Sequence, residues 1–285
     1  VRACASLELL QACALIHDDL MDGSDTRRGK PAIHKHFEKL HARESAVGSS
    51  VGFGQAAAIL LGDLALVYSD LALHQSGINT AVLPNVLAVH DEMRVELMAG
   101  QFLDIYEQTR SSHTVERALT IARYKSGKYT IERPLHLGAV IARPSATEHS
   151  ELLNVLSAYG LPLGEAFQLR DDMLGIFGDP ETTGKPAGDD LREGKRTVLM
   201  AMTMEKASDA ARAELSANLG KPDLSPEKIE SLRALIIDTG AVADVEKLID
   251  RLGEESVAAA NSAAINENAR PFLLALAETA IRRSY

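Results

Sequence analysis

The sequence carries two short acidic clusters, each on a segment with helical periodicity. The first, Asp18–Asp22, reads DDLMD, so Asp18 and Asp22 lie one helical turn apart and share a face. The second is the pair Asp171 and Asp172. Two carboxylates about 6 Å apart repel by roughly 3 kcal/mol at an effective dielectric of 20, so each cluster favours a bound cation. Mg²⁺ is typically bound by one or two carboxylates. Phosphate oxygens and water molecules then complete its octahedral coordination.

Basic residues follow both acidic clusters in loops rich in glycine. Arginine offers a fork of donors to phosphate oxygens, and lysine acts as a point charge. The acidic and basic residues are consistent with one kind of site. In it, carboxylates bind Mg²⁺, Mg²⁺ binds a diphosphate, and the basic side chains neutralise the remaining phosphate charge. Any one of these cations alone is typical of a solvated surface. The set comprises Arg27, Arg28, Lys30, Lys125, Lys128, Lys185 and Lys195.

Neither acidic cluster is specific by itself. With 18 Asp in 285 residues, a DDxxD pattern arises by chance in roughly 6% of such chains. A lone acidic cluster is more often a solvated helix face. A functional site is favoured because the cluster recurs, in part, on a second predicted helix that has its own Gly/Lys loop.

A period of 3.6 residues dominates the chain and predicts an all-α fold. Two segments rich in Gly, Pro and charge are predicted loops, 23–31 and 178–194, and Lys125–Lys128 interrupts a helix. No Gly/Ser linker divides the sequence, which favours a single domain over 1–285. Besides the N-terminal helix and a helix that Ser225-Pro226-Glu227 starts and Gly240 ends, the predicted helices are 56–74, 83–107, 115–125, 129–142, 148–177, 198–205, 209–219, 242–266 and 271–283.

Composition excludes several classes of protein. The net charge of −10 argues against a general nucleic-acid binder, which needs a basic face. No apolar run approaches the 18 residues of a membrane span. Cys4 and Cys13, nine residues apart, would face opposite sides of one helix and cannot bridge within it, which is typical of a reducing, cytoplasmic compartment. The chain begins at Val1 without Met, and we expect an N-terminal part to be missing.

Seven short stretches in order resemble one known family, the trans-isoprenyl diphosphate synthases or polyprenyl synthetases, in particular geranylgeranyl and farnesyl diphosphate synthases. The resemblance covers nearly the whole chain as given. The matching stretches are Leu15–Asp22, Arg27–Pro31, Ile59–Asp63, Lys125–Ser126, Phe167–Asp172, and Gly184–Lys185 with Gly194–Thr197.

The resemblance implies an all-α, single-domain bundle around a deep central cavity, usually a homodimer. The implied reaction is the Mg²⁺-dependent, head-to-tail condensation of isopentenyl diphosphate onto an allylic diphosphate by ionisation, condensation and elimination, with three Mg²⁺ per active site. The implied metal ligands are Asp18, Asp22 and Asp171, with Asp172 acting through water and Asp19 in support. The implied substrate contacts are Arg27, Lys125, Lys185 and Lys195 to the allylic diphosphate, Arg28 to isopentenyl diphosphate, and Ser126 and Gln168 beside the reacting atoms; of these, Lys125, Gln168 and Lys185 would act in the reaction itself.

Two departures from the family pattern stand out. Gly175 occupies the place where the strict second motif has a third Asp, and Asp179 is a candidate substitute through water. The family also carries a Gly-Lys-Arg segment upstream of the first motif that binds isopentenyl diphosphate, and the chain begins after that point.

The helix before the first acidic motif bears on product length. Ala14 and Leu10 lie one and two turns before Asp18 on its face, and Cys13 lies five residues before it. Small residues near the top of a tunnel would let the chain grow past fifteen carbons, so we predict a C20 product with Leu10 or Leu7 as a deeper stop. The alternative is that these small residues only pack helix against helix.

Three other interpretations remain open. A class I terpene cyclase would need aromatic faces to steer carbocations, whereas aromatics are 4% of this chain and Trp is absent. A non-catalytic regulatory subunit of a prenyl diphosphate synthase would be expected to lose site residues that are retained here. A zinc site at His17, His34 and His36 lacks the ligand spacing of known zinc motifs.

Overall fold

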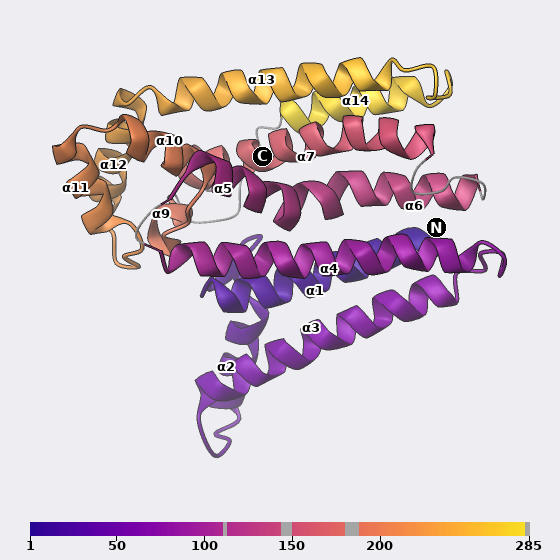
Figure 1. The fold of residues 1–285 in the computed structure, drawn as a ribbon. Helices are drawn as coiled ribbons and strands as arrows, with labels where there is room; N and C mark the ends of the chain where they lie inside the picture. Colours follow the sequence, from indigo (N-terminus) through magenta and orange to yellow (C-terminus); the bar gives the residue numbers. More distant parts are fainter. Residues whose placement is uncertain (111–112, 144–149, 180–187, 283–285) are drawn as a thin grey trace. The chain divides into compact units, whose positions relative to one another are not determined.

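The computed structural model describes residues 1–110, 113–143, 150–179 and 188–282, and these confirm the predicted all-α class (Figure 1). The described residues fall into two compact units, residues 1–83 (unit 1) and the residues from 84 onward (unit 2). The single domain expected from the sequence stays a prediction.

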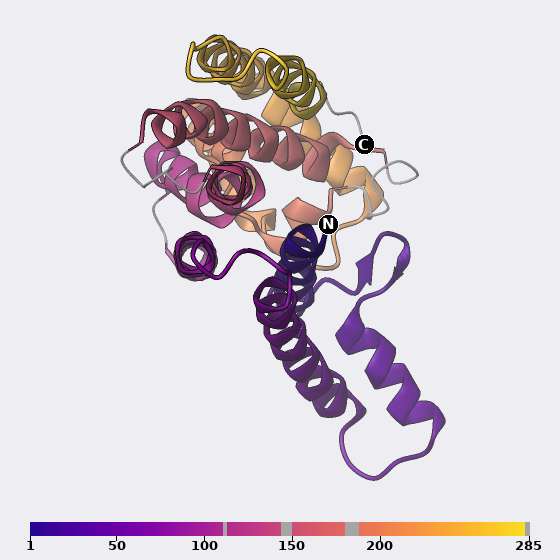
Figure 2. The same cartoon turned by 90° about the vertical axis from the view of Figure 1, so that its right-hand side faces the viewer.

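Unit 1 packs two helices against a long third one. Helix α3 packs against both α1 and α2 (Figure 2). The buried Ser69 hydroxyl of α3 donates to the Ser6 carbonyl of α1 over 2.7 Å, which ties the last turns of α3 to the first turns of α1. The elements are α1 (Arg2–Met21), β1 (Thr26–Arg27), β2 (Lys30–Pro31), α2 (Ile33–Arg43) and α3 (Ser50–His74).

Unit 2 is a bundle whose core lies between α7, α10, α12 and α13. Burial raises the pKa of Tyr159 to about 12, so its hydroxyl keeps its proton and donates to the Leu273 carbonyl over 2.8 Å, which joins α7 to α14. The elements are α4 (Leu83–Gln108), α5 (Val115–Ala122), η1 (Arg123–Glu132), α6 (Arg133–Ala142), α7 (Glu151–Phe177), α9 (Asp189–Glu193), α10 (Val198–Lys206), α11 (Asp209–Asn218), α12 (Pro226–Asp238), α13 (Ala241–Ala260) and α14 (Arg270–Ile281).

The predicted interruption at Lys125–Lys128 is a π-helix rather than a break. Element η1 runs without a gap between α5 and α6, so the predicted helices 115–125 and 129–142 end and begin at the wrong residues. Glycines on both sides let its backbone approach its neighbours: a Cβ on Gly100 of α4 would overlap the Lys125 backbone, and Gly164 of α7 lies directly against Gly127. Helices of this type are rare and often mark functional sites.

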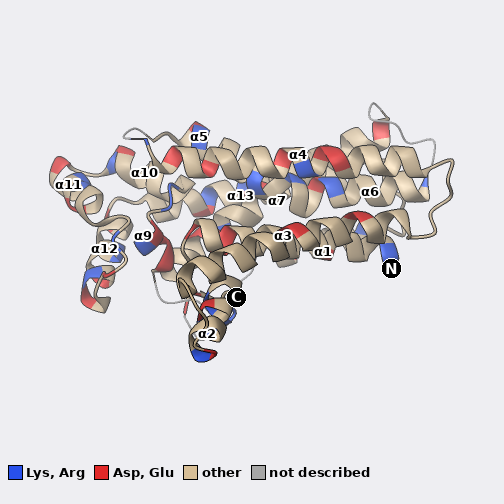
Figure 3. Ribbon diagram, turned by 90° about the horizontal axis from the view of Figure 1, so that it is seen from below, with Lys and Arg blue, Asp and Glu red and all other residues tan. Residues whose placement is uncertain are grey.

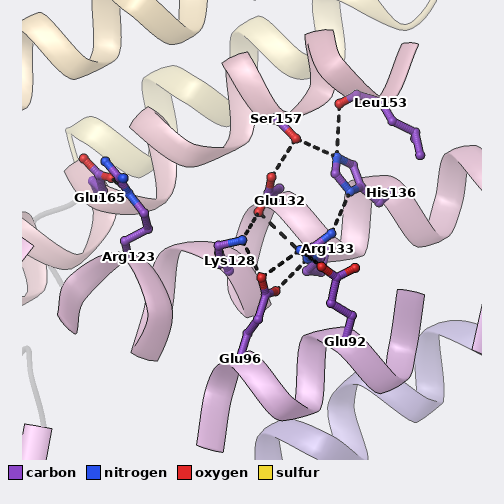
Figure 4. Close-up of polar contacts among 10 residues, drawn as sticks. All are labelled: Glu92, Glu96, Arg123, Lys128, Glu132, Arg133, His136, Leu153, Ser157 and Glu165. Carbon is purple, nitrogen blue, oxygen red and sulfur yellow. Dashed lines mark hydrogen bonds and ion pairs between the residues drawn. The ribbon is translucent and has the colours of Figure 1, made fainter. Parts of the chain in front are cut away.

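A buried charged network fastens η1 and α6 to the helices on either side (Figure 4). Arg133 donates to Glu96 over 2.7 Å and to Glu92 over 2.7 Å, both on α4. On the other side, the Ser157 hydroxyl of α7 donates to Glu132 over 2.6 Å. Burial alone would raise the pKa of Glu96, but the hydrogen bonds from Arg133 and Lys128 outweigh it and lower that pKa. Removing one member would leave a buried charge uncompensated, which is costly.

Helix α3 is unusually apolar, and Figure 3 shows few charged positions along it. By length and composition alone it could cross a bilayer, a test that the core helix of a soluble protein also passes. In its most apolar 18-residue stretch, 28% of the residues are buried, and the helix exposes Leu60, Val67 and Tyr68, among others. No membrane span is expected from the sequence, and a single helix of this kind is weak evidence for one.

Three elements differ from the sequence-based expectation. Helix α2 is absent from the predicted set. The loop predicted over 23–31 contains the β1–β2 hairpin, and the loop predicted over 178–194 contains the short helix α9. The predicted start of α12 is confirmed, because the Ser225 hydroxyl accepts from the Lys228 N–H over 3.3 Å and Pro226 is the first helical residue.

Candidate active site

The first acidic motif lies at the C-terminal end of α1. Asp18 is in the last turn and Asp22 is the C-cap residue, whose N–H donates to the Asp18 carbonyl over 2.8 Å. Gly23 adopts a φ of 69°, and the Ser24 N–H donates to the Asp19 carbonyl over 2.9 Å, which is a Schellman closure. These carboxylates sit at the C-terminal end of α1, which is the negative end of the helix dipole, and the last turn holds no basic residue to offset them. This helix end therefore favours a cation.

Arg27 returns to the acidic motif from the hairpin. Its Nε donates to Asp19 Oδ1 over 2.9 Å and to Oδ2 over 3.2 Å, and its Nη2 lies 3.9 Å from Asp18 Oδ2. Asp19 is only 3% exposed, so its carboxylate is committed to the guanidinium. The Arg27 guanidinium therefore lies beside the carboxylate of Asp18, and the supporting role of Asp19 stays a prediction.

Arg28 occupies a strained position at the tip of the hairpin. The pairs Thr26 with Pro31 and Arg27 with Lys30 leave a two-residue loop, and φ is 52° at Arg28 and 70° at Gly29. Positive φ at both central residues defines a type I′ turn, which favours Asn-Gly. An arginine in this conformation costs of order 1 kcal/mol, and the Arg28 side chain is exposed.

Arg28→Asn is expected to stabilise the hairpin and, if Arg28 binds isopentenyl diphosphate as the family resemblance implies, to weaken that binding. Asparagine tolerates the left-handed conformation, so the melting temperature should rise by about 2 °C. The KM for isopentenyl diphosphate should rise about tenfold as the guanidinium is lost. Thermal unfolding and steady-state kinetics check this, with Arg28→Lys as a control that keeps both the charge and the strain. An unchanged KM in Arg28→Asn would contradict the assignment of Arg28.

His17 fixes α1 against α3 immediately before the acidic motif. Its Nε2 lies 3.2 Å from the Ile59 carbonyl and 3.6 Å from Asp63 Oδ1. A Cβ on Gly62 would overlap the His17 ring, so the glycine makes room for it. The Gly62-Asp63 pair thus has a structural role: Gly62 leaves space for the His17 ring, and the Asp63 carboxylate lies beside it.

Lys125 and Ser126 lie on η1 in unit 2. The Lys125 ammonium lies 2.6 Å from Asp104 Oδ2 on α4, and the two side chains are 20% and 10% exposed. Ser126 is buried. Asp104 was not predicted from the sequence, because it lies 21 residues from Lys125 on another helix and no local pattern links the two.

The second acidic motif lies in the last turns of α7. Asp171 is exposed, whereas Asp172 is buried and accepts a hydrogen bond from Gln168 Nε2 over 2.7 Å. The pKa of Asp172 is raised well above its ordinary value, first by burial and then by the charge of Asp190, with a smaller contribution from Asp171. Negative charge therefore accumulates at this end of α7.

Asp190 of α9 occupies the space that Gly175 leaves. A Cβ on Gly175 would overlap the Asp190 carboxylate, and Asp190 is only 6% exposed. Lys195 lies 3.6 Å from Asp190 and 2.8 Å from Glu193. Asp179 is exposed beyond the end of α7. Asp190, rather than the exposed Asp179, is therefore the carboxylate that lies beside Gly175 and acts on Asp172.

The remaining predicted residues stand as follows. Lys185 lies outside the described residues. Leu10 and Cys13 are buried and Ala14 is half-buried, which both interpretations of these residues predict. Across the described parts of the chain, no group of three or more His, Cys, Asp or Glu could hold a metal ion. Mg²⁺ is usually held by one or two carboxylates together with substrate phosphates, so such a group is not what the proposed site requires.

Comparison with known proteins decides the family. Residues 1–236 match the family model of the polyprenyl synthetases. The chain belongs to the polyprenyl synthetase family. This confirms the resemblance drawn from the acidic and basic motifs.

Relatives in this family are named for prenyl chain elongation. A short chain isoprenyl diphosphate synthase of Methanothermobacter thermautotrophicus is 33% identical over 228 residues, which are 79% of this chain and 63% of that protein. A geranylgeranyl diphosphate synthase of Mycobacterium tuberculosis is 31% identical over 287 aligned positions, covering 98% of this chain and 72% of that protein. The chain thus spans less than two thirds of the archaeal relative and about three quarters of the mycobacterial one.

Solved structures in the polyprenyl synthetase family share this fold. The crystal structure of a geranylgeranyl pyrophosphate synthase from Corynebacterium glutamicum, complexed with isoprenyl diphosphate and magnesium, superposes with a TM-score of 0.94 at 45% identity. The match covers 99% of this chain and 78% of that one. The helical fold of the isoprenoid synthases, expected from the motifs, is therefore confirmed.

Proposed function

We propose that the chain condenses isopentenyl diphosphate with an allylic diphosphate, head to tail, and releases an all-trans prenyl diphosphate, with C20 favoured. The observation that carries the proposal is the 45% identity, at a TM-score of 0.94, to a geranylgeranyl pyrophosphate synthase complexed with isoprenyl diphosphate and magnesium. The retained acidic and basic residues of both motifs support it.

The residues at both acidic motifs fit Mg²⁺. At the first motif, carboxylates lie at the negative end of α1. At the second, burial and the charge of Asp190 raise the pKa of Asp172. A hard cation would offset the negative charge at both places. Asp18, Asp22 and Asp171 would hold the ions directly and Asp172 through water, three ions in all. When bound, Mg²⁺ neutralises charge on the departing pyrophosphate.

The side chains of this protein bind the substrates and stabilise the leaving group. Arg27, Lys125 and Lys195, together with Lys185, would hold the allylic diphosphate while its C–O bond ionises. Arg28 would bind isopentenyl diphosphate, whose double bond attacks the allylic carbocation. Gln168 and Ser126 would lie beside the reacting atoms, and pyrophosphate would take the released proton. No nucleophilic side chain is needed.

Exposed apolar side chains support a homodimer. Helix α3 exposes Leu60 and Val67, and α4 exposes Phe102 and Tyr106, whose rings stack 6.1 Å apart. Apolar faces of this extent are typical of protein interfaces. We propose that a second copy of the chain covers these side chains, and that neither nucleic acid nor a bilayer does. The expected mass in light scattering is that of a dimer. We also propose that the protein works in the cytoplasm.

Incubation with labelled isopentenyl diphosphate, Mg²⁺ and each allylic starter in turn tests the function. A C20 prenyl diphosphate that depends on Mg²⁺ is the expected product. Failure to form any product, with normal binding of both diphosphates, would overturn the proposal in favour of a regulatory subunit. Cyclic hydrocarbons would indicate a terpene cyclase instead.

Cys13→Phe is expected to shorten the product from C20 to C15. A phenyl ring at this buried position would fill the space that the growing chain uses below Asp18. Product sizing by chromatography measures the change. Cys4→Phe, on the exposed part of the same helix, is the matched control and should leave product length unaltered. A C20 product from Cys13→Phe would mean that Cys13 only packs helix against helix.

A further inference from the structure

The two lysines of η1 have different surroundings, although both pair with acids of α4. The Lys128 ammonium lies 2.5 Å from Glu96 and 3.5 Å from Glu132, and its side chain is 13% exposed. Two carboxylates thus compensate this lysine inside the network of Figure 4. A lysine held in this way has a structural role.

Lys125 pairs with a different acid of α4 and is more accessible than Lys128. Asp104 lies 2.6 Å from its ammonium, and the Lys125 side chain, at 20%, is more exposed than that of Lys128. Asp104 itself is only 7% exposed, so its carboxylate depends on a cationic partner for compensation. Gly100, one turn before Asp104, brings the η1 backbone against α4 and fixes the reach of the lysine.

This arrangement sets up a competition for one ammonium group. A diphosphate that binds Lys125 must share it with Asp104 or displace that carboxylate. The apparent affinity of a ligand falls by the fraction of the protein that is ready to bind it. A buried carboxylate that keeps Lys125 occupied therefore weakens the binding of diphosphate and hastens its departure.

We propose that Asp104 is the resident counter-ion of Lys125, with which pyrophosphate competes for the ammonium, so that Asp104 sets how quickly pyrophosphate is released. Asp104 acts through Lys125 and is a positioning residue. The inference rests on the proposed function, in which Lys125 binds the allylic diphosphate. In that reaction pyrophosphate is the leaving group, and a site that bound it too tightly would be inhibited by its own product.

Calorimetric titration of the whole chain with inorganic pyrophosphate and Mg²⁺ tests the proposal without turnover. Asp104→Asn removes the charge but keeps an oxygen that accepts from the ammonium, so pyrophosphate should bind about tenfold more tightly, and kcat and KM for the allylic substrate should fall together. Lys125→Ala should bind it about tenfold more weakly. Asp104→Glu keeps the charge and should bind close to the unmodified protein. Asp91→Asn, in an exposed ion pair of the same helix, is the control and should change nothing.

A double variant separates the possible failures. In the Lys125→Ala background, Asp104→Asn should have no further effect, because its route to pyrophosphate is gone. Tightening that persists in this background would mean direct repulsion and would overturn the proposal, as would unchanged or weaker binding in Asp104→Asn alone. Lys125→Ala that binds pyrophosphate normally would instead refute the role of Lys125 in the proposed function.

Discussion

Asp171→Asn is expected to lower kcat by at least ~10³-fold while the melting temperature stays within about 2 °C. Asp171 is exposed at the end of α7, so the substitution leaves the core intact. It removes one carboxylate charge where the proposed Mg²⁺ and pyrophosphate meet. Steady-state kinetics measure the loss, and titration with Mn²⁺ followed by electron paramagnetic resonance measures metal binding independently of turnover.

Two neighbouring aspartates sharpen this test. Asp190→Asn should lower metal affinity by about 10- to 100-fold, because the buried Asp190 carboxylate lies beside Gly175 and its charge acts on Asp172. Asp179→Asn, an equally conservative change just beyond the helix, should leave activity unchanged. The reverse ranking, with a silent Asp190→Asn and a damaging Asp179→Asn, would restore the assignment made from the sequence alone.

Local signals in the sequence predicted most of the fold. Helix α12 begins where Ser225, Pro226 and Glu227 indicate, because capping depends only on residues within one turn. Helix α2 does carry a local signal, because Ile33, Phe37 and Leu40 follow the spacing of an amphipathic helix. Its many charged and histidine residues obscured that spacing.

Features that depend on distant partners could not be predicted. The π-helix η1 owes its course to Gly100 and Gly164, which lie on two other helices. Asp190 reaches the second acidic motif because Gly175 lacks a side chain, and no local pattern in the sequence reports that contact. The acidic motifs themselves were recognisable, whereas the carboxylates that complete or balance the site depend on the fold.

Gly164→Ala is expected to lower both stability and kcat. The added methyl group would overlap the backbone of Gly127, so η1 must move away from α7. Overpacking of this kind costs typically ~1–3 kcal/mol, and here backbone rather than a flexible side chain has to yield. Lys125 and Ser126 lie on η1, so their displacement should lower kcat by about 100-fold, since misplacement of about 1 Å has this effect.

Gly138→Ala provides the matched control on the neighbouring helix α6. Apart from its chain neighbours and the backbone of its own helix, no atom of the described residues lies within 4 Å of a Cβ at Gly138. Alanine should therefore raise the free energy of unfolding by ~0.5–1 kcal/mol through its higher helix propensity. Urea unfolding and kinetics at saturating substrate compare the two variants. Opposite changes in stability, with kcat lost only in Gly164→Ala, would show that close contact between η1 and α7 positions the site. Equal stability of both variants would mean that η1 yields without cost, and the π-helix would then have no part in positioning Lys125.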